Sequence, residues 1–280
     1  MNGAAKIQAD PKLTPVMRKD VRLSNAEYHA RDEINKSRLD AIAKYPAYYK
    51  AEYIDKVITR TQTPAMLIGS AYHKLQTEPQ NFHDDFAVAP KINKRTKAGK
   101  EAWAEFEKQA AGKDLIDEED YAVIENMVSS VLDHPAAGKL MGLKGVAEST
   151  RIWKDDATGL QCKCRPDWLC KDAKIIVDLK TTEDARPEAF SRSIHKYRYH
   201  VQSGFYLMGC EEIEQFIFIA VEKKPPYSVV CYTASPMMIS AGQRAARTNL
   251  DTLKTCIESN RWPGIADTIQ PLELPRYNND

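Results

Sequence analysis

The sequence predicts an α/β fold in which a helical N-terminal part precedes a mixed sheet flanked by helices. Apolar residues in the first half recur at helical spacing, as in AMLIGSAYHKLQT over 65–77. After Gly142 the chain changes to short runs of β-branched and alternating residues separated by turn signals. A chain of 280 residues can bury one substantial core. We therefore expect one domain over 21–262, with a flexible arm at 1–20 and an irregular tail at 263–280.

Start and stop signals predict the N-terminal helices. Ser24 followed by Glu27 fits a capping box. Pro46 ends or bends a helix that Ser37 opens. Helical spacing predicts further helices over 65–77 and 118–132, and one around Trp103 and Phe106, two side chains that we expect in the core.

The second half alternates strands with helices. Strands are predicted over 147–153, 160–169, 174–180, 216–221 and 227–233. Helices are predicted over 187–210 and 236–260. A helix between the third and fourth strands favours a mixed sheet with helices packed against it.

Composition excludes several classes of protein. No apolar run is long enough to cross a membrane, and the N-terminus lacks the apolar stretch of a signal peptide, so we expect a cytosolic protein. None of the six cysteines forms a C-x-x-C pair, which argues against structural zinc. Cys162 and Cys164 lie on one face of a strand and are interpreted as reduced, half-buried residues. An iron–sulfur cluster is the alternative, but its usual cysteine run is missing.

The strand over 174–180 carries the strongest chemical signal. Asp178 and Lys180 point to the same face of a strand rich in β-branched residues. Burying charge is costly unless the charge is paired or binds metal. Asp167, at the end of the preceding strand, would join them if the two strands form a hairpin. A structural Asp–Lys ion pair at the end of the sheet is the alternative interpretation.

Two carboxylates and a backbone oxygen form a hard oxygen site that suits Mg²⁺, with Mn²⁺ as a substitute. A metal ion there can activate water and neutralise charge on a phosphate. The lysine would then stabilise the transition state or orient the water. The residues are therefore compatible with metal-assisted phosphodiester hydrolysis, beside the alternative of a structural ion pair.

Pro166-Asp167 followed by Asp178-Leu179-Lys180 resembles the motif of the PD-(D/E)xK nuclease superfamily. The stretch LSNAEYHARDEINKSRLDAIAKYPAYYK also resembles the opening of the RecE (exonuclease VIII) nuclease domain, and the resemblance extends over residues 21 to about 262. It implies a restriction-endonuclease-like core. Each motif alone is weak, whereas together they are specific.

The resemblance also implies roles for particular residues. His73 would be a metal ligand with Asp167, Asp178 and the backbone carbonyl of Leu179, and Lys180 would be the catalytic lysine. Gln202 and Tyr206, at i and i+4 on one helix face, would form the Q-x-x-x-Y element of the RecB-like branch. Glu148 is a further candidate ligand, because many members have an acidic residue before the PD.

By the same resemblance, the chain would degrade one strand of linear duplex DNA from the 5′ end, leaving 3′ single strands for recombination by strand annealing. It would act as a homo-oligomeric ring, a tetramer being favoured, with a RecT-like single-strand annealing protein in a phage or prophage setting. Because the net charge is only +1, DNA contacts must be local. The candidate contacts are Lys91, Lys94, Arg95, Lys97, Lys100, Arg192, Lys196 and Arg198.

Three alternatives stay open. An endonuclease on the same core would use the same chemistry. A DNA-binding protein could keep the fold without the activity, although the complete set of Asp167, Asp178 and Lys180 argues against it. A nuclease with an iron–sulfur cluster is disfavoured by the cysteine spacing.

Overall fold

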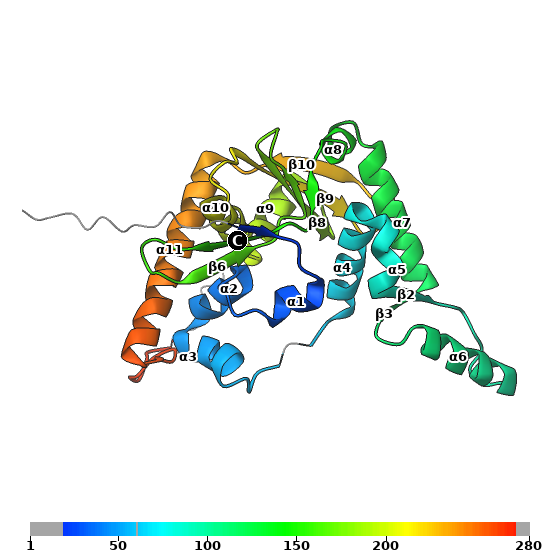
Figure 1. Cartoon of the computed structure of the whole chain (residues 1–280), viewed down its shortest axis with the longest axis horizontal. Coiled ribbons are helices and arrows are strands. Elements are labelled where there is room, and N and C mark those ends of the chain that lie inside the picture. The colour runs from blue at the N-terminus through cyan, green and yellow to red at the C-terminus, as the bar shows by residue number, and fades with distance from the viewer. Residues whose placement is uncertain (1–18, 60, 273–280) are drawn as a thin grey trace, which may run out of the picture.

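The structure is a computed structural model that describes residues 19–59 and 61–272 (Figure 1). Its α-helices are α1 (Asn25–Ala30), α2 (Lys36–Lys44), α3 (Pro46–Tyr49), α4 (Pro64–Thr77), α5 (Phe82–Asp85), α6 (Lys97–Gln109), α7 (Glu118–Asp133), α8 (Pro135–Met141), α9 (Pro187–Lys196), α10 (Tyr199–Gly209) and α11 (Pro236–Ser259). A π-helical turn at Lys50–Ile54 follows α3, and a 3-10 turn at Pro79–Asn81 precedes α5. None of the described helices is long and apolar enough to span a membrane.

A five-stranded mixed sheet forms the centre of the molecule, as predicted. Its order is β10 (Val229–Thr233), β9 (Gln215–Glu222), β8 (Ile175–Thr182), β7 (Trp168–Cys170) and β4 (Val146–Ala147). β8 and β9 are parallel, and the other pairs are antiparallel. The predicted hairpin is present, since Trp168 pairs with Val177 and Cys170 with Ile175.

Both faces of this sheet are covered by helices. Successive side chains of β8 and β9 point alternately into two apolar clusters, one on each face. Ile176 and Phe218 face the side packed by α2, α10 and α11. Val177, Leu179 and Ile219 face the opposite side, packed by α4 and α7. Figure 1 shows these two groups of helices on either side of the strands. The alternation predicted for residues 174–180 is confirmed, and it puts Asp178 and Lys180 on the α10 side.

The strand predicted over 147–153 is in fact two strands in two sheets. β4 ends at Ala147, and β5 (Thr150–Lys154) joins a second sheet of order β1 (Lys19–Val21), β5 and β6 (Gln161–Cys164). The change of sheet occurs at Glu148, whose φ of 49° lies in the left-handed region. The run predicted over 160–169 divides in the same way, into β6 and β7. Continuous β-like patterning did not reveal these breaks.

Other boundaries also differ from the sequence prediction. The capping box at Ser24 and Glu27 is present. The next helix is capped by Asn35 rather than Ser37, because the Asn35 side chain accepts the Arg38 N–H. The helical stretch over 187–210 is divided into α9 and α10 by Arg198, whose φ is 55°. Most of the predicted N-terminal arm, residues 1–18, lies outside the described residues.

A projecting arm was not predicted. β2 (Phe86–Ala89) and β3 (Asp114–Asp117) form a parallel pair, and the chain between them carries α6 away from the body (Figure 1). Trp103 and Phe106 are half-buried on α6, with ring centroids 5.2 Å apart, and belong to neither core cluster. The expectation of core positions for them is wrong, because α6 projects away from the body and the two rings contact each other instead. The amine of Lys94 lies over the Trp103 ring.

The six cysteines are free. Cys162 and Cys164 are fully buried rather than half-buried, and the Cys164 and Cys210 sulfurs lie 4.0 Å apart. Burial raises the pKa of the Cys162 and Cys170 thiols, so they are poor nucleophiles.

The second sheet is attached to α11 by a buried carboxylate. Asp155, 4% exposed, accepts hydrogen bonds from the Arg247 guanidinium at 2.5 and 2.8 Å and from the Thr158 hydroxyl. Burial alone would raise the pKa of Asp155, but the hydrogen bonds from Arg247 and Thr158 hold it below its ordinary value. A carboxylate with a depressed pKa stabilises the fold above its unfolded pKa, and the contribution is lost as pH falls through the folded pKa.

We expect Arg247→Ala to lower the free energy of unfolding by about 2 kcal/mol at neutral pH, less than for a fully buried pair because Arg247 is partly exposed. The difference from wild type should shrink as pH falls below the ordinary Asp pKa of 3.8. Urea unfolding at neutral and acidic pH measures both effects. Arg244→Ala, on the exposed face of the same helix, is the matched control. An equal loss at both pH values would contradict the assigned role of Asp155.

Candidate active site

Three of the predicted ligands converge from three separate elements. His73 comes from α4, Glu148 from the junction of β4 and β5, and Asp167 from the residue before β7. One ligand atom of each lies within 4.8 Å of the other two. His73 Nδ1 is 3.3 Å from Asp167 Oδ1. Two carboxylates and an imidazole around one point form a donor set that can hold a divalent metal ion.

Asp167 is fixed by backbone contacts on both sides. Its Oδ2 accepts the backbone N–H of Leu179 at 2.7 Å, and its carbonyl accepts the N–H of Glu148 at 3.2 Å. Burial would raise the pKa of Asp167, but the His73 and Lys180 charges and the hydrogen bonds from His73 and from the Leu179 N–H hold it below its usual value. Asp167 therefore stays ionised and its second oxygen faces His73.

Glu148 is held in an unusual backbone conformation at the change of sheets. A left-handed φ is uncommon for a residue with a side chain, and such conformations cluster at functional sites. Burial and the neighbouring charge of Asp167 raise the pKa of Glu148 to about 7. The Arg165 guanidinium lies 3.8 Å from its carboxylate and offsets part of that effect.

Asp178 and Lys180 form a buried pair next to this cluster. The Asp178 carboxylate is ion-paired with Lys180 and accepts a hydrogen bond from Gln202 Nε2 at 2.5 Å. Burial, with the nearby Asp167 charge, raises the pKa of Asp178 to about 6, although Lys180 opposes the shift. The Lys180 amine lies 4.7 Å from the centre of the Tyr199 ring. Asp178 is not one of the three residues whose ligand atoms lie within 4.8 Å of one another.

Gln202 and Tyr206 share one face of α10, but they contact different parts of the site. Gln202 binds Asp178, whereas the Tyr206 hydroxyl donates to the carbonyl of Arg165 at 3.4 Å. Arg165 directly precedes the Pro166-Asp167 dipeptide. The helix thus holds both β8 and the segment that leads into Asp167.

Two cavities open on the site. The main cavity, about 750 Å³, contains His73 and Asp167 and extends to Phe86 and Asp114 at the base of the arm. The smaller cavity, about 210 Å³, contains Tyr206. Four residues line both cavities: Asn25, His29, Glu148 and Arg165.

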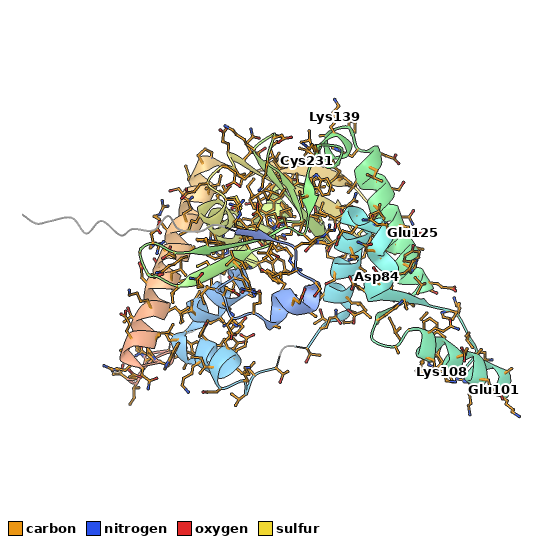
Figure 2. The ribbon with its side chains drawn as sticks, viewed as in Figure 1. Asp84, Glu101, Lys108, Glu125, Lys139 and Cys231 are labelled. Carbon is orange, nitrogen blue, oxygen red and sulfur yellow. The ribbon has the colours of Figure 1, made fainter. Side chains whose placement is uncertain are left out.

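The predicted DNA contacts lie in two places outside the cavities. One group is on the loop and first turn of the arm: Lys91, Lys94, Arg95, Lys97 and Lys100, all exposed. The other is on and after α9: Arg192, Lys196 and Arg198. Two members already have acidic partners, since Lys91 pairs with Glu119 and Arg198 with Asp40. Figure 2 shows Glu101 and Lys108 on the same projecting helix.

Sequence reasoning missed Asn25, His29 and Arg165, which line the cavities beside the predicted ligands. The available signal was the segment LSNAEYHA, which carries the RecE resemblance but was given no role. Arg165 lies two residues before Asp167, and a single basic residue at that position is equally typical of a solvent-exposed surface.

Comparisons with known proteins concern the fold and the family of the chain. A solved structure of a candidate exonuclease from Eubacterium rectale has a TM-score of 0.58 over 90% of this chain and 97% of that one, at 11% identity, which is a likeness of fold. A phage-related exonuclease from Haemophilus somnus 129PT covers 82% of this chain and 97% of its own at 13% identity, but its TM-score of 0.36 supports no argument. No curated protein matches significantly.

The family model described as a PDDEXK-like domain of unknown function (DUF3799) matches residues 36–275. That range includes every predicted catalytic and metal-binding residue. The chain belongs to this family, and its core is a nuclease-type domain of the PD-(D/E)xK superfamily.

Proposed function

We propose that the chain is a metal-dependent exonuclease that hydrolyses phosphodiester bonds of linear double-stranded DNA. The observation that carries the proposal is the convergence of His73, Glu148 and Asp167 beside the buried Asp178–Lys180 pair. Carboxylates and an imidazole in an open cavity next to a lysine provide what phosphodiester hydrolysis needs: ligands for a divalent cation and a fixed positive charge.

In this proposal His73, Glu148 and Asp167 would hold Mg²⁺ or Mn²⁺, and Asp178 and the carbonyl of Leu179 would complete the ligand set. When bound, the metal would supply water activation and would neutralise charge on the phosphate. The other tasks belong to the protein. Because Asp167 remains ionised at neutral pH, it offers a charged ligand before a cation binds.

Lys180 provides a fixed positive charge beside the reacting phosphate. Burial opposes its charge, but the carboxylates of Asp178 and Asp167 raise the pKa of Lys180 above its ordinary value, so the amine stays protonated. Its hydrogen bonds can stabilise negative charge on the nonbridging oxygens as water adds to phosphorus and the 3′ oxygen leaves. Gln202, through its bond to Asp178, keeps this pair oriented.

The basic residues of the arm and of α9 are proposed to bind the DNA backbone. Residues 91–100 carry five cations and no acidic residue. The main cavity extends from the metal ligands to the base of this arm, so duplex outside the cavity would reach it. Contacts to phosphate give affinity without sequence specificity.

We expect Lys97→Ala/Lys100→Ala to weaken duplex binding and to reduce the slope of log K against log salt by about 2, one for each lost phosphate contact. Fluorescence anisotropy of a labelled duplex with Ca²⁺ in place of Mg²⁺ measures the slope. Lys139→Ala/Lys144→Ala, on and after α8, is the matched control and should leave the slope unchanged. An unchanged slope in the arm variant would remove the arm from the DNA-binding surface.

Direction and assembly rest on the resemblance to RecE. We infer cleavage from the 5′ end, a ring-shaped homo-oligomer, and cooperation with a RecT-like annealing protein. The test is digestion of linear duplex labelled at the 5′ or the 3′ end, beside a closed circle, with Mg²⁺ and with EDTA. Early metal-dependent release of the 5′ label from linear DNA alone supports the proposal.

The other outcomes separate the alternatives. Cutting of the closed circle would identify an endonuclease on the same core. Binding without cleavage of any substrate would favour an inactive DNA-binding protein. Early release of the 3′ label would keep the exonuclease and reverse its direction.

A further inference from the structure

The first helix of the domain lines the cavity that contains the candidate metal ligands, and two buried cations hold it there. α1 lies in the segment LSNAEYHA, which the proposed chemistry leaves without a role. With six residues, α1 is too short to be stable alone in water. Its position therefore depends on contacts with the body of the protein, and those contacts come from β6 and the residue just after it.

Lys163 holds the C-terminal end of α1. Its side chain is 1% exposed, and its amine donates to the carbonyls of Tyr28 at 2.5 Å and Arg31 at 2.8 Å. A cation that binds the last carbonyls of a helix also interacts favourably with the helix dipole. The nearest described carboxylate, on Glu33, is 3.9 Å away, so backbone carbonyls are the main partners of this charge.

Arg165 holds the other end. Its guanidinium donates to the carbonyls of Leu23 and Ser24, each at 3.2 Å, and lies 4.0 Å from the centre of the Tyr28 ring. The ring is also 4.5 Å from the Lys163 amine. Tyr28 is 8% exposed, and both cations contact its ring. These contacts keep the Tyr28 face of α1 turned toward the body of the protein.

Because Tyr28 faces the body of the protein, the other face of α1, which carries Asn25 and His29, is exposed. These residues are one helical turn apart and line both cavities, together with Glu148 and Arg165. Asn25 and His29 therefore stand where the two cavities share their lining, within reach of a strand that occupies either of them. Burial and the charges of Arg165 and Lys163 lower the pKa of His29, so its neutral ring can both donate and accept a hydrogen bond.

We propose that Asn25 and His29 hydrogen-bond to the backbone of the DNA strand next to the phosphate that is cleaved, and that Lys163 is a positioning residue that holds α1 in place for this contact. The inference rests on the proposed nuclease function and adds to it a binding element for the substrate strand. Neutral polar side chains are common partners of phosphate and sugar oxygens.

The first experiment compares Asn25→Ala and His29→Ala with two matched controls. Asn126→Ala on α7 and His83→Ala on α5 remove exposed side chains that line neither cavity. We expect each α1 variant to lower kcat/KM on linear duplex about tenfold, as for one lost hydrogen bond to substrate, and the controls to match wild type. Mn²⁺ affinity, measured by calorimetry without DNA, should stay unchanged in all four.

The second experiment tests the positioning role of Lys163. Lys163→Met keeps the length of the side chain and removes its bonds to α1. It should lower kcat/KM on DNA while leaving Mn²⁺ affinity intact. In the Asn25→Ala/His29→Ala background it should add little, because the contacts that it positions are already gone. A full additional loss in that background, or a loss of Mn²⁺ affinity, would show general structural damage and overturn the role.

The results distinguish this inference from the proposed function. If wild type cleaves DNA with metal and both α1 variants cleave equally well, the inference fails and the function stands. If kcat/KM and Mn²⁺ affinity fall together in those variants, the residues belong to the metal site and the inference also fails. If wild type cleaves no DNA, the proposed function itself fails and takes the inference with it.

Discussion

Lys180→Ala should lower the rate of DNA cleavage at saturating Mg²⁺ about 1000-fold, the range seen when a donor that stabilises transition-state charge is removed. The side chain is 12% exposed and is paired with Asp178, so it presents one fixed charge at the site. Single-turnover cleavage of end-labelled duplex measures the effect on the chemical step. Binding of duplex in Ca²⁺ should change little, because the many backbone contacts elsewhere remain.

Removing Lys180 leaves Asp178 buried without its ion pair, so stability must be measured alongside the rate. Lys180→Met fills the same space, and urea unfolding of both variants identifies any loss of fold. Lys144→Ala, an exposed lysine 3.1 Å from Asp172, is the control and should cleave normally. If Lys180→Met is well folded and cleaves DNA at a near wild-type rate, Lys180 is not the source of the catalytic positive charge, and another residue must supply it.

Asp167→Asn is expected to have the second large effect, a loss of Mn²⁺ affinity of at least about 100-fold with cleavage falling below detection at ordinary metal concentration. Asparagine retains an oxygen that can accept the Leu179 N–H, so the backbone contact at 2.7 Å can survive. What it loses is the negative charge that faces His73 and Glu148. Calorimetric titration with Mn²⁺ measures the affinity without requiring activity.

Asp172→Asn provides the matched control for this variant. It makes the same chemical change five residues along the chain, in the exposed turn between β7 and β8, where the carboxylate is 73% exposed. Asp178→Asn completes the comparison. If Asp178 is a ligand, it too should weaken Mn²⁺ binding, whereas an effect on cleavage alone would assign it to holding Lys180.

The sequence predicted the centre of the fold because that part obeys simple periodicity. The alternation of Ile176, Asp178 and Lys180 against Val177 and Leu179 matches the two apolar clusters. The hairpin that brings Asp167 to β8 followed from one turn signal between two strands. In a strand that is covered on both faces, the alternation of residue types along the sequence predicts which face of the sheet each side chain occupies.

The parts that were missed depend on contacts that periodicity does not record. The backbone at Glu148 leaves one sheet for another within a run that reads as continuous β structure. The helices α9 and α10 are divided at a left-handed Arg198, a conformation that sequence pattern does not mark. β2 and β3 are four residues each, too short for alternation to be recognised. The helix around Trp103 and Phe106 was predicted, but nothing in the sequence showed that it stands on a projecting arm.

The candidate site shows the same division. His73, Gln202 and Tyr206 were selected by resemblance, and their proximity to the aspartates depends on helix packing that the sequence alone could not predict. Asn25, His29 and Lys163 were passed over because a histidine, an asparagine or a lysine in isolation is most often a surface residue. Lys163 in particular is a buried cation with carbonyl partners far away in the chain.

The parallel pairing of β8 and β9 also determines when the site can exist during synthesis of the chain. Parallel neighbours cannot be joined by a tight turn, so residues 183–214 must cross over the sheet before β9 can add to β8. Gln202 lies within that crossover, and β9 covers the edge of the strand that bears Asp178. A nascent chain that has emerged only as far as Lys180 therefore contains Asp178 and Lys180 but lacks α10, the helix that carries Gln202 and covers them. Their burial is a long-range, slowly acquired property, and catalytic competence should appear only after the crossover has folded.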